Sequence, residues 1–228
     1  MPSVNLALAP REVRIPFGDT WLYGDLLMPP GFQSLVLFAH GSGSGRHSAR
    51  NRQVAQHLQH VGIATLLFDL LTAQEEQTDL NTREHRFDIA LLTRRMQDAT
   101  AWAAAQPELL HAAIGYFGAS TGSAAALLAA ARLGNKIAAV VSRGDRPDLA
   151  GAVALAAVTA PTLLIVGGAD HEVIKLNQQA LKHLRCEKSL AMVPGATHLF
   201  EEASTLQQVA QLASSWFTAH LTPLQHTP

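Results

Sequence analysis

Short apolar runs alternate with longer amphipathic segments along most of the chain. Residues 35–39 (LVLFA) are continuously apolar, which is typical of a strand buried on both faces of a sheet. Residues 49–60 instead place Val54, Ala55 and Leu58 on one stripe, which is the spacing of an amphipathic helix. Repeated units of this kind predict strands connected by helices, and therefore a mostly parallel sheet.

The same criteria predict the remaining elements. Two strands joined at Gly18-Asp19 should form a hairpin, six strand–helix units should follow it, and a polar loop is expected over 70–82. The predicted strands are 12–17, 21–28, 35–39, 63–68, 112–117, 137–141, 161–166 and 189–193. The predicted helices are 49–60, 83–105, 120–133, 149–157, 173–184 and 203–220. We therefore expect a single α/β domain over residues 1–228, with a central sheet of about eight strands and helices on both faces, and a fraying tail at 222–228.

Composition indicates a folded protein without a strongly charged partner. Hydrophobic residues make up 48% of the 228 residues and charged residues 15%, and 17 Lys+Arg stand against 18 Asp+Glu. Because phosphate backbones are bound by clustered positive charge, we expect no nucleic-acid partner. One basic cluster exists, and we expect it on the exposed face of a solvated helix; it consists of Arg83, Arg86, Arg94 and Arg95.

The sequence shows neither a disulfide framework nor a targeting signal. Cys186 is the only cysteine, so the chain has neither an intrachain disulfide nor a cysteine-based zinc site, and we expect this thiol to be inert. Residues 1–10 lack the basic start and apolar core of a signal peptide. The chain also lacks an uncharged apolar run of about 18 residues, so no membrane association is expected. These features predict a cytoplasmic protein, and the sequence leaves open whether it is a monomer or a homodimer.

The strongest chemical motif is Gly118-Ala119-Ser120-Thr121-Gly122, a G-x-S-x-G sequence. It lies between an apolar strand and an Ala-rich helix, the setting of a nucleophile elbow. Such a turn would lift the Ser120 hydroxyl above the sheet, at the amino end of a helix that favours negative charge. The alternative is that Ser120 simply caps the helix, because serine is a good N-cap residue.

A serine hydroxyl needs a base to remove its proton, and that base needs an acid to orient it. His198 follows the last predicted strand by a few residues and Asp170 follows the strand before it, so both should reach the sheet edge that carries Ser120. The order Ser…Asp…His is the one found in α/β-hydrolases. Asp145 and Asp148, after the preceding strand, are rival acids.

The segment His40-Gly41-Ser42-Gly43 directly follows a buried strand and can supply a donor for the oxyanion of a tetrahedral intermediate. We expect the backbone N–H groups of Ser42 and Thr121 to form the pair, with His40 as a structural support. A phosphate-binding loop is the alternative. It fails on spacing, because Arg46 stands where G-x-G-x-x-G requires its last glycine.

Together these segments resemble the α/β-hydrolase superfamily and, within it, the dienelactone-hydrolase-like branch. The resemblance extends over nearly the whole chain and is carried by residues 40–48 (HGSGSGRHS), 142–148 (SRGDRPD) and 195–200 (GATHLF). It implies the α/β-hydrolase fold with a minimal lid or none, and a triad of Ser120, Asp170 and His198, with Asp170 favoured over the rival acids. Dienelactone hydrolases proper use a cysteine nucleophile, whereas this chain has serine.

The resemblance predicts a hydrolase that attacks a small-molecule acyl substrate, an ester, thioester or lactone, through an acyl-enzyme and without metal or organic cofactor. A catalytically silent binding or regulatory protein on the same fold is the alternative, since fold does not fix function. Several residues are candidates for substrate contacts. They are Arg46, Leu71, Arg143 and Arg146. For Arg143 and Arg146, an ion pair with Asp145 or Asp148 is the competing interpretation.

Overall fold

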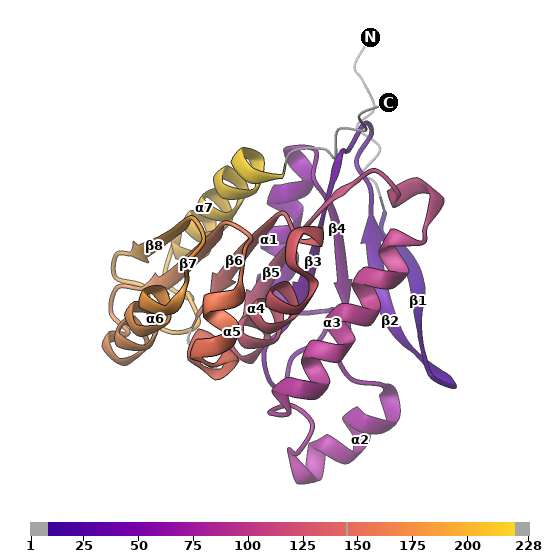
Figure 1. Cartoon of the computed structure of the whole chain (residues 1–228), viewed down its shortest axis with the longest axis horizontal. Helices are drawn as coiled ribbons and strands as arrows, with labels where there is room; N and C mark the ends of the chain where they lie inside the picture. Colours follow the sequence, from indigo (N-terminus) through magenta and orange to yellow (C-terminus); the bar gives the residue numbers. More distant parts are fainter. Residues whose placement is uncertain (1–8, 145, 222–228) are drawn as a thin grey trace.

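A single eight-stranded sheet organises the computed structural model, which describes residues 9–144 and 146–221 (Figure 1). The strands are β1 Arg11–Phe17, β2 Thr20–Leu27, β3 Ser34–Ala39, β4 Ala64–Phe68, β5 Ala113–Ala119, β6 Ala139–Arg143, β7 Thr162–Gly167 and β8 Lys188–Val193. They lie in the order β1-β2-β4-β3-β5-β6-β7-β8. The β1–β2 and β2–β4 pairs are antiparallel and all later pairs are parallel, which confirms the predicted, mostly parallel sheet.

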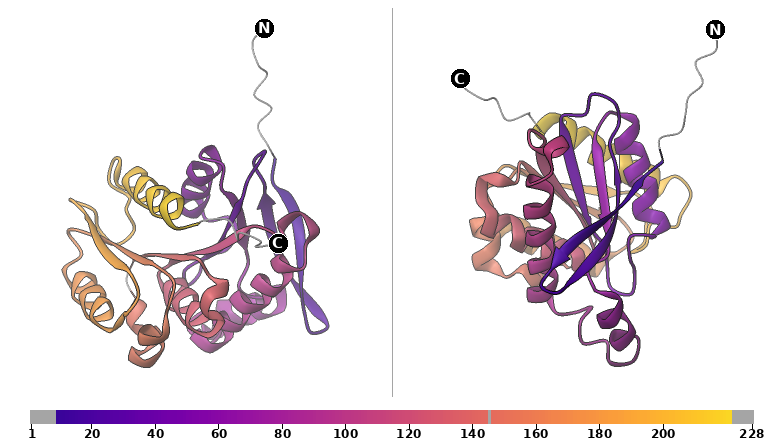
Figure 2. Two further views of the ribbon diagram at one scale, coloured as in Figure 1. Left: turned by 45° about the horizontal axis from the view of Figure 1, so that its top comes forward. Right: turned by 90° about the vertical axis from the view of Figure 1, so that its right-hand side faces the viewer.

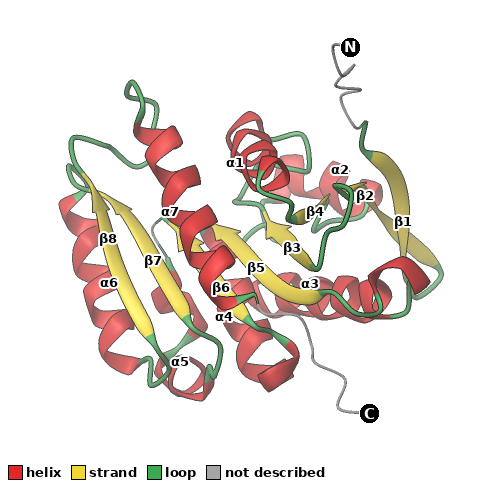
Figure 3. Cartoon of the chain, turned by 90° about the horizontal axis from the view of Figure 1, so that it is seen from above, coloured by secondary structure: helices red, strands yellow, loops and turns green. Residues whose placement is uncertain are grey.

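Helices cover both faces of this sheet. The α-helices are α1 Ala49–His60, α2 Ala73–Thr82, α3 Ile89–Ala104, α4 Thr121–Leu133, α5 Ala152–Ala157, α6 His171–His183 and α7 Thr205–His220. Short 3-10 helices are η1 Pro107–Leu109, η2 Gly134–Lys136 and η3 Pro147–Ala150. Figure 3 shows α1 and α7 on one side of the twisted sheet and α3 and α4 on the other.

The position of strand β3 in the sheet explains why its sequence is continuously apolar. Leu35, Leu37 and Ala39 point into the core beneath α3, α4 and α6, while Val36 and Phe38 point into the core beneath α1 and α7. Every residue of β3 is buried, as expected where helices cover both faces of a parallel sheet.

The predicted loop over 70–82 is wrong, because most of it forms α2 (Ala73–Thr82). Thr72 and Glu75 build a capping box: the Thr72 hydroxyl accepts from the Glu75 N–H, and the Glu75 carboxylate accepts from the Thr72 N–H. The helix is stabilised locally despite its polar composition. Figures 1 and 2 show α2 projecting from one end of the molecule.

The helix predicted from Arg83 begins instead at Ile89. Arg83 adopts a left-handed conformation that ends α2, and Asp88 caps α3 by accepting from the Leu91 N–H. The helix predicted over 149–157 is likewise interrupted: Gly151, at a φ of 83°, separates η3 from α5. The other elements agree with prediction to within a few residues at their ends.

The prediction that the arginine cluster lies on a solvated face is wrong for two of its members. Arg95 is fully buried, with its guanidinium over the Phe17 ring and an ion pair to Glu75. Arg86 pairs with the buried carboxylate of Asp79. The pattern of charges did not reveal these contacts, because Phe17 lies on β1 and both Glu75 and Asp79 lie on α2.

Among residues 9–144 and 146–221, every helix is too short or too polar to cross a lipid bilayer. The predicted fraying of residues 222–228 lies outside the described residues.

Candidate active site

Ser120 occupies the sharp turn between β5 and α4. Its backbone has φ 55° and ψ −126°, a strained conformation for a residue with a side chain. The residue stands at the N-cap position of α4, yet its hydroxyl makes no capping hydrogen bond to the helix. The helix-cap interpretation therefore fails, and the Ser120 hydroxyl remains available for chemistry.

Two glycines make this turn sterically feasible. A Cβ on Gly118 would lie 2.6 Å from the Cα of Ser123 in α4, and one on Gly122 would lie 2.3 Å from the carbonyl oxygen of Ala39 at the end of β3. Real side chains do not tolerate such approaches. The G-x-S-x-G spacing thus follows from how closely β5, α4 and β3 pack.

Asp170 and His198 meet at the carboxyl ends of β7 and β8. Asp170 caps α6, with Oδ1 accepting from the Val173 N–H at 3.4 Å. Its Oδ2 lies 3.2 Å from Nδ1 of His198. Since a carboxylate only accepts, Nδ1 carries the proton and Nε2 is left as the acceptor, which is the tautomer a general base needs.

Backbone contacts hold these two loops together. A Cβ on Gly167 would lie 2.5 Å from the carbonyl oxygen of Ala196, so only glycine permits this approach. The Ala169 N–H donates to that same carbonyl at 2.9 Å, and the Gly168 N–H donates to Val193 at 2.8 Å. The position of Asp170 relative to His198 is therefore set by the main chain.

Glu202 fixes the residue before His198. Its Oε1 accepts from the Thr197 N–H at 3.1 Å and from the Thr197 hydroxyl at 2.5 Å. The hydrogen bond from the Thr197 hydroxyl, aided by backbone N–H groups, lowers the pKa of the Glu202 carboxyl below its ordinary value. Sequence analysis missed this residue, because nothing in the segment 195–202 marks it as a partner of Thr197.

The loop after β3 packs directly against the elbow. A Cβ on Gly41 would lie 2.9 Å from Cβ of Ser120. The Ser42 hydroxyl donates to the carbonyl of Arg86 at 3.2 Å and lies 2.9 Å from the Thr121 hydroxyl. Thr121 is the first residue of α4, so its backbone N–H has no partner within the helix. The two predicted oxyanion-hole residues therefore flank Ser120.

His40 supports this loop from beneath. It is buried, and its Nε2 accepts from the Leu70 N–H at 3.0 Å, so Nδ1 carries the proton and donates to the carbonyl of Gly41 at 3.0 Å. Burial lowers the pKa of His40 below its ordinary value of 6.5. A neutral ring that bridges two backbone segments fits the structural role expected for it.

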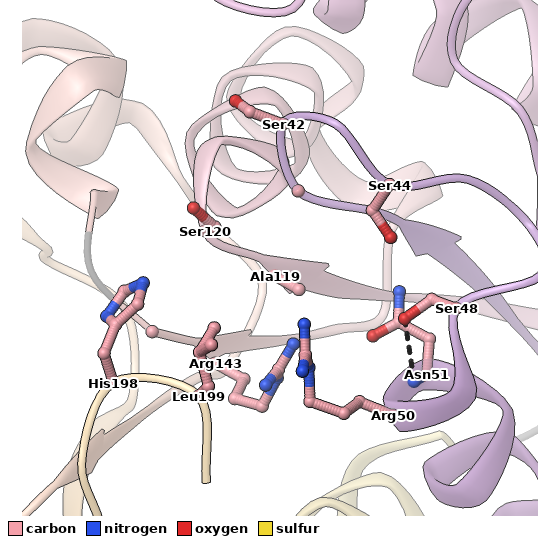
Figure 4. A pocket seen from close by; sticks show the side chains of 12 residues that line it. Ser42, Ser44, Ser48, Arg50, Asn51, Ala119, Ser120, Arg143, His198 and Leu199 are labelled. Atoms are coloured by element: carbon pink, nitrogen blue, oxygen red, sulfur yellow. Dashed lines mark hydrogen bonds between the residues drawn. The ribbon is translucent and has the colours of Figure 1, made fainter. Parts of the chain in front are cut away.

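A pocket of about 160 Å³ opens at Ser120 (Figure 4). His198 and Arg143 line it together with residues from the β3–α1 loop and the first turn of α1. Its lining residues are Gly41, Ser42, Ser44, Ser48, Arg50, Asn51, Ala119, Ser120, Arg143, Gly144, His198 and Leu199. Ser120, His198 and Ser42 are thus brought to one cavity, as their spacing along the chain predicts.

Of the four predicted substrate residues, Arg143 is the one that lines this pocket. It is 7% exposed, and its guanidinium lies over the Phe200 ring at 5.7 Å. Arg146 instead forms a two-fold ion pair with Asp148, each bond at 3.0 Å. The rival acid Asp148 is therefore engaged with Arg146, and the other rival, Asp145, lies outside the described residues.

Arg46 and Leu71 lie away from the pocket lining. The guanidinium of Arg46 bridges three carboxylates, with closest approaches of 3.0 Å to Glu12 and 3.5 Å to both Asp25 and Asp69. Leu71 packs against the core beneath α3 and α4. Both side chains have structural partners, so the structure gives no support to their predicted substrate contacts.

Sequence analysis did not select the residues that α1 contributes. Ser48 caps α1, and Arg50 and Asn51 follow it in the first turn. The available signal was their position: they follow the oxyanion loop, at the carboxyl edge of the sheet. Within the described part of the chain, no group of three or more His, Cys, Asp or Glu residues could hold a metal ion.

Comparison with known families gives one match that covers most of the chain. Residues 33–226 match the model of the dienelactone hydrolase family. A crystal structure of a dienelactone hydrolase from Anabaena variabilis is 54% identical with a TM-score of 0.91, and the alignment covers 94% of this chain and 100% of that one. The esterase domain of a Rhodothermus marinus protein shares only 19% identity at a TM-score of 0.71, over 93% of this chain and 100% of that one. These likenesses confirm the α/β-hydrolase fold.

Two curated proteins of Mycobacterium tuberculosis, from the CDC 1551 and H37Rv strains, are 53% identical over 214 residues. They are provisionally named phosphoribosyl transferases. The match covers 94% of this chain but 47% of theirs, so the chain spans about half the length of these relatives.

Proposed function

The chain belongs to the dienelactone hydrolase family, and from this premise we propose that it is a serine hydrolase acting on small carboxylic ester, thioester or lactone substrates. Ser120 is the nucleophile, His198 the general base and Asp170 the residue that orients it. The observation that carries the proposal is the state of Ser120: its strained turn and uncapped hydroxyl open into the pocket that His198 also lines.

The reaction follows from this geometry. The Ser120 hydroxyl attacks the substrate carbonyl and gives its proton to Nε2 of His198, while the Asp170 carboxylate stabilises the resulting imidazolium. The carbonyl oxygen becomes an oxyanion that accepts hydrogen bonds from the N–H groups of Ser42 and Thr121. His198 then protonates the leaving group, which departs and leaves an acyl group on Ser120. A water molecule, deprotonated by His198, releases the acid by the same steps.

Family membership alone does not supply the nucleophile, because dienelactone hydrolases proper use cysteine. Cys186, the chain's only cysteine, is half-buried between α6 and β8, and burial raises the pKa of its thiol. Reactive thiols are found where neighbours lower the pKa instead. Serine is therefore the nucleophile that this proposal requires.

The transferase name of the mycobacterial relatives does not conflict with a hydrolase. The chain matches a hydrolase family over residues 33–226 and spans 47% of each relative, so we infer that any transferase activity belongs to the half that it does not span.

The test is labelling with an uncharged fluorophosphonate, followed by mass spectrometry to locate the modified residue. We expect one label, on Ser120, that is lost in Ser120→Ala and slowed at least about a hundredfold in His198→Ala. Ser123→Ala is the matched control, because that serine is buried in α4. Folded protein that remains unlabelled would contradict the proposal and favour a catalytically silent binding protein on the same fold.

A further inference from the structure

Part of the pocket lies beyond the reacting groups and has a distinctly basic, polar lining. Arg143 enters it from the end of β6, and Ser44, Ser48, Arg50 and Asn51 enter it from the β3–α1 loop and the first turn of α1. Figure 4 shows the Arg143 guanidinium pointing away from His198 into this region, and the Arg50 guanidinium and the Asn51 amide extending into it from α1 on the opposite side. Attack on a carbonyl requires none of these five side chains.

Nε of Arg50 and Oδ1 of Asn51 are buried without a hydrogen-bond partner among the described residues. Asn51 is 2% exposed, so its amide lies almost entirely out of solvent. Buried polar groups in native proteins nearly always have a hydrogen-bond partner, and a buried group without one costs free energy. These two atoms therefore indicate a ligand that completes their hydrogen bonding.

We propose that this region binds a phosphate monoester group on the substrate; the inference rests on the proposed hydrolase function and names its substrate class. Each guanidinium offers planar N–H donors suited to phosphate oxygens, and the serine hydroxyls add more. The region also adjoins the amino end of α1, where unpaired N–H groups and the helix dipole favour anions. Asn51, which both donates and accepts, suits a hydroxyl group next to the phosphate.

A phosphate fits this region better than a carboxylate. The donors of two arginines, two serines and a helix terminus exceed what two carboxylate oxygens can accept, whereas phosphate has three free oxygens and up to two charges. Arg50 does approach Glu201, at 3.3 Å, but that carboxylate is 66% exposed and screened by water. The pocket volume of about 160 Å³ is enough for several water molecules, and therefore for a phosphate group.

Protection of Ser120 from the fluorophosphonate tests this inference separately from the hydrolase proposal. Labelling itself reports the reactive serine, and slowing of labelling by a small anion reports the phosphate site. We choose glycerol 3-phosphate, with glycerate and glycerol as its carboxylate and neutral counterparts, at constant ionic strength. We expect half-protection by glycerol 3-phosphate at about millimolar concentration, and a concentration at least about tenfold higher for glycerate.

Arg50→Gln should raise the half-protecting concentration of glycerol 3-phosphate about tenfold, each variant being compared with its own unprotected rate. Arg52→Gln is the matched control: it removes the same charge from the same helix, but Arg52 pairs with Asp25 and does not line the pocket, so protection should change less than about twofold. Labelling without protection by glycerol 3-phosphate would overturn the inference while leaving the hydrolase intact. Equal protection by glycerate would contradict the preference for phosphate and indicate a carboxylate site. Protection that is unchanged in Arg50→Gln would show that the anion binds outside the region that Arg50 lines.

Discussion

The hydroxyl groups of Ser42 and Thr121 lie 2.9 Å apart, so the two residues whose N–H groups we assign to the oxyanion hole are also joined through their side chains. The Ser42 hydroxyl donates in turn to the carbonyl of Arg86. The loop after β3 is thus tied to the first turn of α4 and to the segment between α2 and α3. An oxyanion hole needs donors that are in place before the reaction begins, and these hydrogen bonds hold them there.

We predict that Ser42→Ala and Thr121→Val each lower kcat about three- to tenfold, with KM unchanged, because each removes the shared hydrogen bond but keeps the backbone N–H. The double variant should be about as impaired as Ser42→Ala, because the hydrogen bond that Thr121→Val removes is already lost in Ser42→Ala. Steady-state hydrolysis of p-nitrophenyl acetate measures the effect. Losses that multiply in the double variant would show that the two hydroxyls act independently.

Asp170→Asn separates the two roles of this carboxylate. Asparagine caps a helix as well as aspartate does, so the Val173 N–H keeps its acceptor and the melting temperature should change little. The negative charge beside Nδ1 of His198 is lost, and kcat should fall on the order of 10⁴-fold.

Asp148→Asn is the matched control, because it removes the rival acid. Asp148 is engaged with Arg146 at the surface, so we expect kcat within about twofold of the wild type. A large loss in Asp148→Asn together with a small loss in Asp170→Asn would reverse the assignment of the acid.

The sequence predicts most of this architecture because its signals are local. Strand β3 can be recognised from five successive apolar residues. The elbow can be recognised from two glycines, because a side chain at either position would collide with Ala39 or Ser123. Parallel topology then places the ends of β5, β7 and β8 at one edge, so Ser120, Asp170 and His198 converge without further information.

One miss has a local cause, and the others depend on contacts between distant segments. Helix α2 looks like a polar loop until the capping box of Thr72 and Glu75 is weighed. Arg95 looks solvated because its partners lie on β1 and α2. Arg50 and Asn51 read as ordinary helix residues, and only the closeness of α1 to the elbow places them in the pocket.

His40 makes stability depend on pH. Burial lowers its pKa below 6.5, so between the two values the unfolded chain binds a proton that the folded protein excludes. Its contribution is fully present above pH 6.5 and is lost as the pH falls toward the lower, folded value. We expect the free energy of unfolding to decrease from pH 7.5 to 5.5, with His40 contributing at most about 1.4 kcal/mol per pH unit.

Urea unfolding across that range measures the slope for the wild type and for His40→Gln, whose amide oxygen can still accept from the Leu70 N–H. All other histidines are common to both proteins, so the difference between the slopes isolates His40. The variant should be less stable at pH 7.5 but show the flatter dependence. Two parallel curves would mean that His40 does not exclude the proton.

Arg95 anchors α2, the helix that projects beyond the sheet. Its guanidinium lies 3.3 Å from the centroid of the Phe17 ring and pairs with Glu75, the residue that completes the capping box of α2. We predict that Arg95→Met lowers the free energy of unfolding by about 1.5–3 kcal/mol, the value of a hydrogen bond to a charged group, even though methionine can fill much of the space. Hydrogen exchange in α2 should quicken more than exchange in α4.

Arg94→Met is the matched control, because it removes the neighbouring positive charge from the exposed face of α3 and should change stability by less than about 0.5 kcal/mol. Urea unfolding gives the free energies, and mass-resolved hydrogen exchange locates the loosened segment. Replacing a buried ion pair can be neutral where the new residue packs well. Unchanged stability and unchanged exchange in α2 for Arg95→Met would therefore show that packing against Phe17, and not the bond to Glu75, fixes this helix.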